Sequence, residues 1–73
     1  MFLKLTRVTD PPISVYINME HVSCFCPNPN VNGADLFDAN ESEYPWTVQE
    51  TPQEIQAMIL SMHVWMRNNS GLT

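Results

Sequence analysis

The chain has 73 residues, of which 44% are hydrophobic, and eight acidic against three basic residues give a formal net charge of -5. This length predicts one domain over residues 1–73. So short a chain buries only about 60% of the surface that it exposes when unfolded, and small domains of this kind often gain stability by association. Three basic residues neutralise few phosphates, which argues against direct nucleic-acid binding.

Alternation of apolar and polar residues predicts short strands along most of the chain. We expect them at residues 2–8, 13–18, 22–26, 34–39 and 46–50. In the first strand, Phe2 or Leu3 and then Leu5 face inward. The first two strands form a hairpin, because the turn between them, residues 9–12, ends in two prolines.

The third predicted strand carries both cysteines of the chain. Period-two alternation places Val22, Cys24 and Cys26 on one face and Phe25 on the other. We interpret the cysteines as small apolar residues on the buried face. The alternative is a metal site in which His21, and at a distance His63, join them. A Cys-x-Cys spacing matches structural zinc sites poorly, so no metal or cofactor is predicted.

A helix follows the last predicted strand. Thr51 is its N-cap, Pro52 its first residue, and Glu54 closes a Thr-x-x-Glu capping box. The helix should run to about Arg67, with one wide apolar stripe on the side that covers the sheet. The stripe comprises Ile55, Met58, Ile59, Met62, Trp65 and Met66.

A second, outward stripe on the same helix consists of Ala57, Leu60 and Val64. A helix that covers the sheet of a monomer should be polar on this side. The stripe therefore indicates that the helix is sandwiched, either by another copy or by a protein partner. The alternative is incidental exposure of single apolar residues, which is common.

These elements predict an α+β fold. It is a small antiparallel β-meander or half-open barrel of four to five strands, with one C-terminal helix over the face that needs covering.

Three segments of the chain resemble small flagellar and swarming-motility proteins of the FlbD type. They are residues 4–7 (KLTR), residues 15–18 (VYIN) followed by Val22, and residues 47–55 (TVQETPQEI). The pattern is also similar to short β-meander proteins of phages and mobile elements. The resemblance implies the same small fold and, for the first group, a motility accessory function.

The acidic residues gather in the middle of the chain, where no lysine or arginine interrupts them. The candidate partner-binding residues among them are Asp35, Asp38, Glu41 and Glu43. The spacing does not match a calcium-binding loop. The acidic cluster instead predicts either a solvated face or a surface that meets a basic partner.

Together these features favour a non-enzymatic protein. The chain shows no glycine-rich phosphate loop and no convincing pair of nucleophile and base. We expect a small protein-interaction module that forms a homo-oligomer, acting as an accessory or inhibitor protein encoded by a phage or mobile element. The alternatives are the motility accessory and a small-ligand-binding oligomer.

The apolar segments are all short. None reaches the roughly 18 residues that a membrane span needs, and the first residues lack the long apolar core of a signal peptide. We therefore expect no membrane span and a cytoplasmic location.

Overall fold

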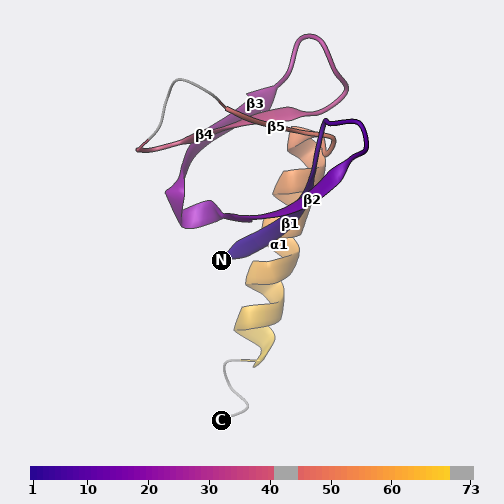
Figure 1. The fold of residues 1–73 in the computed structure, drawn as a ribbon. Helices are drawn as coiled ribbons and strands as arrows, with labels where there is room; N and C mark the ends of the chain where they lie inside the picture. Colours follow the sequence, from indigo (N-terminus) through magenta and orange to yellow (C-terminus); the bar gives the residue numbers. More distant parts are fainter. Residues whose placement is uncertain (41–44, 70–73) are drawn as a thin grey trace.

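The computed structural model describes residues 1–40 and 45–69, with side chains over 1–40 and 45–65. Within these described ranges, five strands form one antiparallel sheet in the order β2-β1-β5-β4-β3. The strands are β1 (Phe2–Arg7), β2 (Ile13–Asn18), β3 (Val22–Pro27), β4 (Ala34–Asp38) and β5 (Trp46–Val48). One helix, α1 (Pro52–Asn69), follows them (Figure 1), so the predicted α+β fold is confirmed.

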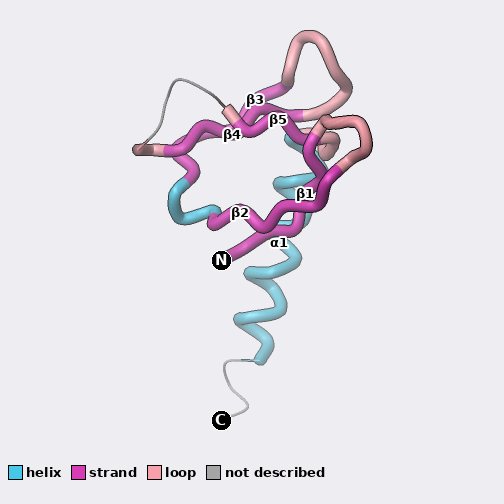
Figure 2. The backbone as a smooth tube through the Cα atoms, viewed as in Figure 1, coloured by secondary structure: helices cyan, strands magenta, loops and turns pink. Residues whose placement is uncertain are grey.

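The sheet curls on itself, as Figure 2 shows. Its two edge strands, β2 and β3, are consecutive in the chain and are joined by a single 3₁₀ turn, η1 (Met19–His21). Asn18 caps this turn by accepting a hydrogen bond from the backbone N–H of Glu20 at 3.1 Å. The backbone N–H of Met19 donates to the carbonyl of Met1 at 2.8 Å, which holds η1 against the start of β1.

The core lies between the concave face of the sheet and the first turns of α1. Leu3 and Leu5 are buried, and they pair across the hairpin with Ile17 and Val15. Period-two alternation therefore identified the inward residues of β1, with Leu3 rather than Phe2 facing the core. The fully buried core is completed by Ala34, Leu36, Val48 and Ile55.

The capping box at the start of α1 is confirmed. The hydroxyl of Thr51 accepts from the backbone N–H of Glu54 at 3.2 Å and donates to the Glu54 carboxylate at 3.1 Å. The carboxylate also accepts from the backbone N–H of Thr51 at 3.3 Å. The helix extends to Asn69, two residues beyond the predicted end at Arg67.

The prediction that the cysteines lie on the buried face was wrong. A β-bulge interrupts the pairing of β3 with β4 between Val22 and Cys24. Because one extra residue reverses the alternation, Val22 and Phe25 both pack against the core, whereas Cys24 and Cys26 are exposed.

Strand β5 is shorter than predicted, ending at Val48 instead of Glu50. The cause is a change of hydrogen-bond acceptor at that point. The Glu50 carboxylate, rather than a backbone carbonyl, accepts the hydrogen bond from the backbone N–H of Thr6. Strand β4 is also shorter than predicted and ends at Asp38, one residue early. The backbone N–H of the next residue, Ala39, still donates a hydrogen bond to the carbonyl of His21.

Candidate interaction surface

The distal half of α1 continues beyond the sheet that its first turns cover (Figure 1). Its 18 residues make it about 27 Å long, and the core contacts come from Ile55, Met58 and Ile59. Trp65 is 62% exposed. The predicted core stripe is therefore correct for its first half but wrong at Trp65, which lines a groove against β1 and is not part of the buried core. The side chain of Met66 lies outside the described part of the chain.

The outward stripe is exposed as the sequence predicted. Leu60 is 59% exposed and Val64 is 43% exposed. Ala57 is also exposed, but it lies at the edge of a shallow groove between α1 and β1. Leu60 and Val64 line neither of the two grooves beside α1 that are described below.

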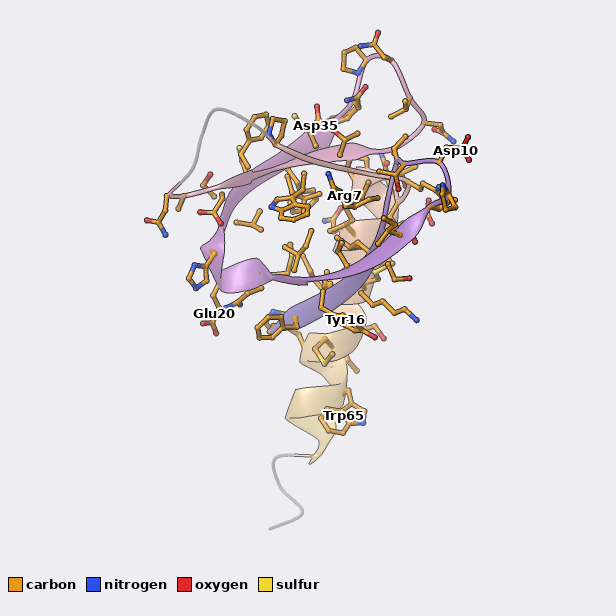
Figure 3. All side chains as sticks on the ribbon, viewed as in Figure 1. Arg7, Asp10, Tyr16, Glu20, Asp35 and Trp65 are labelled. Carbon is orange, nitrogen blue, oxygen red and sulfur yellow. The ribbon has the colours of Figure 1, made fainter. Side chains whose placement is uncertain are left out.

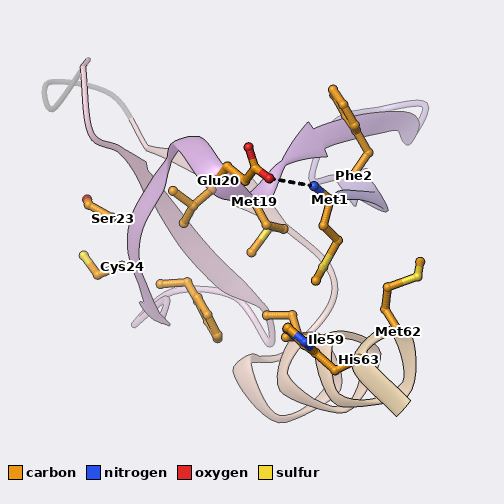
Figure 4. Close-up of a pocket in the computed structure, with 11 residues that line it drawn as sticks. Met1, Phe2, Met19, Glu20, Ser23, Cys24, Ile59, Met62 and His63 are labelled. Atoms are coloured by element: carbon orange, nitrogen blue, oxygen red, sulfur yellow. Dashed lines mark ion pairs between the residues drawn. The ribbon is translucent and has the colours of Figure 1, made fainter. Parts of the chain in front are cut away.

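The larger groove, with a volume of about 1060 Å³, lies between α1 and the corner where η1 joins β2 to β3. Figure 4 shows Met1 and Met19 facing Ile59 and Met62 across it. The remaining lining residues are Phe2, Glu20, Val22, Ser23, Cys24, Phe25 and His63. Thioether, aliphatic and aromatic groups dominate this lining, which makes the groove a site for apolar surface.

The smaller groove, of about 750 Å³, lies on the other side of α1 against β1. It is lined by Phe2, Leu3, Lys4, Ala57, Met58, Ser61, Met62 and Trp65. Phe2 and Met62 line both grooves, so the two form one continuous apolar surface around the helix.

The sequence did not predict this surface. Its residues come from the start of β1, from η1, from the bulged strand β3 and from α1. Its α1 residues include members of both predicted stripes, namely Met58, Ile59, Met62 and Trp65 from the core stripe and Ala57 from the outward stripe. The exposed Phe2, at 61%, is the one available signal, because it is a large apolar residue next to the inward Leu3.

Charged groups at the larger groove are few. Glu20 stands at its rim, with its carboxylate 3.6 Å from the N-terminal ammonium group. Its side chain is 77% exposed, so this ion pair contributes little to stability.

The acidic candidates lie elsewhere. Asp35 accepts hydrogen bonds from the Thr47 hydroxyl at 2.7 Å and from the Asn28 amide at 2.9 Å, and these bonds tie β4 to β5 and to the preceding loop. Asp38 accepts from the backbone N–H of Asn40 at 2.7 Å. Figure 3 shows Asp35 and Trp65 at opposite ends of the molecule. Glu41 and Glu43 lie outside the described residues.

The alternative metal site is not assembled. Among the side chains described, those of residues 1–40 and 45–65, no group of three or more His, Cys, Asp or Glu is placed to hold a metal ion. Cys24 and His63 line the same groove, but His21 and Cys26 do not. In the same part of the chain, no helix combines the length and the apolar character that crossing a membrane requires.

Comparison of the chain with protein-family models, with curated proteins and with solved structures gives no match.

Proposed function

We propose that this protein is a small non-enzymatic protein-interaction module that binds its partner through the outward stripe of α1. The observation that carries the proposal is the exposure of Leu60 and Val64 on a helix whose opposite side already covers the sheet. Neighbouring apolar side chains on one helix face are a common anchor for a partner groove or helix.

Charge supports a basic partner. The net charge of -5 steers positively charged proteins toward the molecule and repels acidic ones. The apolar stripe would then supply most of the affinity, because exposed charge pairs contribute little once they are formed. An accessory or inhibitor protein of a phage or mobile element fits this design, and gene neighbourhood separates that role from a motility role.

The proposal is tested by affinity capture from a bacterial lysate, followed by affinity measurement with the captured protein after purification. We expect Leu60→Lys combined with Val64→Lys to weaken binding by about tenfold or more. The matched control is Gln53→Lys combined with Gln56→Lys, which adds the same charge at exposed polar positions of the same helix.

Two results would contradict the proposal. One is a partner whose affinity is equally reduced by both double variants. That result would mean that the added positive charge, and not the loss of the apolar stripe, weakens binding. The other is the absence of any protein that binds the purified chain with a defined stoichiometry. A basic partner should also dissociate more readily as the salt concentration rises.

A further inference from the structure

The outer edge of β2 presents backbone groups that no neighbouring strand satisfies. In the described part of the chain, β2 pairs with β1 alone. Thr6 directs its N–H and its carbonyl toward residues 49–50, so it forms no ladder bonds with its β2 neighbour Ser14. Because an antiparallel ladder alternates, Val15 bonds to β1, whereas Ser14 and Tyr16 direct both N–H and C=O away from the sheet.

The other edge strand, β3, carries features that keep strands from pairing with it. The bulge after Val22 interrupts its ladder with β4. The N–H of Asn28 donates to the carbonyl of Gly33, and the alternation from that bond turns Phe25 and Pro27 outward. Bulges and prolines block an edge, and proline has no N–H to donate.

Strand β2 has none of these protective features. Its register with β1 is unbroken over all six residues, from Ile13 to Asn18. Its sequence, ISVYIN, holds no proline and no charged side chain. Within the described ranges, β2 is therefore the edge of the sheet that is open to another strand.

The side chains of this edge have the same order of types in both directions from Tyr16. The matching pairs are Val15 with Ile17, Ser14 with Asn18, and Ile13 with Met19. A strand in an antiparallel pair meets its partner in the reverse direction. A second β2 strand centred on Tyr16 therefore places each side chain opposite one of its own kind, apolar, polar or aromatic.

We propose that two copies of this chain form a two-fold symmetric dimer by antiparallel pairing of their β2 strands, with the axis at Tyr16. Each Tyr16 N–H donates to the Tyr16 carbonyl of the other copy, and each Asn18 N–H donates to a Ser14 carbonyl. The Tyr16 side chains, which are 68% exposed in one copy, then lie opposite each other. A contact of one short strand is small, so we expect a dissociation constant below about 200 μM but not a tight dimer.

Amide hydrogen exchange of the full chain, followed by NMR, tests the pairing directly. The outward amides of Ser14 and Tyr16 should exchange at least about twofold more slowly at about 1 mM than at about 50 μM protein. The inward amides of Val15 and Ile17 bond to β1 and should be protected at both concentrations. Sedimentation equilibrium over the same range should show the mass rising from 8.4 kDa toward twice that value.

A proline substitution tests the edge itself. Ser14→Pro removes an outward N–H and breaks no bond to β1, and its ring occupies the side on which the partner strand would lie. We expect it to raise the dissociation constant of the dimer by about tenfold or more. The control Ser14→Ala keeps the N–H and should change this constant by less than about threefold. Circular dichroism should show both variants folded.

A charge exchange at Tyr16 tests the position of the axis. Tyr16→Lys and Tyr16→Glu should each be monomeric, because like charges would lie directly opposite each other. A mixture of the two variants should form a heterodimer, because opposite charges then face each other. This recovery does not depend on Ser14→Pro being folded, and a loss of folding at Tyr16 could not produce it.

Several outcomes would overturn the proposal. They are a monomer at about 1 mM, a dimer whose Ser14 and Tyr16 amides gain no protection, and a mixture of the Tyr16 variants that stays monomeric. Protection that appears only when another protein is added would assign the edge to a foreign strand. A dimer broken only by Leu60→Lys with Val64→Lys would place the interface on the outward stripe. The dimer rests on β2 and not on the proposed function, so either can fail while the other stands.

Discussion

The carboxylate of Glu50 joins Thr6 through two hydrogen bonds that replace the end of a β-ladder. One oxygen accepts from the backbone N–H of Thr6 at 2.9 Å, and the other accepts from its hydroxyl at 3.0 Å. On the other side of the same residue, the carbonyl of Thr6 accepts from the backbone N–H of Gln49 at 2.8 Å. This contact closes β1 onto β5, the pairing that joins the N-terminal hairpin to the rest of the sheet.

Replacing Glu50 by alanine should lower the free energy of unfolding by about 1–3 kcal/mol, because it leaves a partly buried N–H and hydroxyl without their acceptor. Glu50→Gln should lose less than half of that amount, since the amide retains one acceptor and can donate to the hydroxyl. Urea denaturation at one fixed protein concentration measures both. The neighbouring Gln49→Ala is the control, and an equal loss in that variant would show that the carboxylate is not responsible.

The N-cap of α1 supports a separate prediction. Thr51→Ala removes the hydroxyl that accepts from the backbone N–H of Glu54, and should cost about 1 kcal/mol of stability. Thr51→Ser keeps the hydroxyl and should recover most of the loss. Thermal unfolding followed by circular dichroism compares the three proteins. If Thr51→Ser were as unstable as Thr51→Ala, the methyl group and not the hydrogen bond would be the stabilising element.

The features that could be predicted from the sequence are those decided by residues close together in the chain. Thr51 and Glu54 are three residues apart, so their reciprocal capping needs no tertiary information. The inward alternation of Leu3 and Leu5 is likewise local.

The features that were missed depend on contacts between distant segments. The bulge after Val22 reverses which residues of β3 face inward, and no residue type there requires it. The apolar grooves form where β1, η1, β3 and α1 meet, so their lining cannot be recognised along a single element. The exposure of Trp65 depends on whether β1 packs against that turn of α1 or leaves a groove beside it, which periodicity does not report.

Gly33 lies at a close approach between two backbones. A Cβ atom at this position would overlap the carbonyl oxygen of Val48, which belongs to the paired strand β5. Because a paired backbone cannot move aside as a side chain can, Gly33→Ala should destabilise the protein by about 3 kcal/mol. The exposed neighbour Asn32→Ala should change stability by less than about 0.5 kcal/mol.

Chemical denaturation with both variants tests this prediction. A Gly33→Ala protein as stable as Asn32→Ala would mean that β4 and β5 can separate locally without cost. In a separate hydrogen-exchange measurement, the Gly33→Ala variant should also lose protection of the Ala34 and Val48 amides, because these residues pair directly beside Gly33.

The two ends of α1 should differ sharply in their sensitivity to truncation. Ile55 is fully buried among the residues of the sheet, so Ile55→Ala should cost about 2–5 kcal/mol through lost contacts and a residual cavity. Leu60 is 59% exposed, and Leu60→Ala should stay within about 0.5 kcal/mol of the wild type. Urea denaturation at matched protein concentration compares them. A large loss for Leu60→Ala would show that the outward stripe is covered in the folded protein, by a second copy if the loss disappears on dilution.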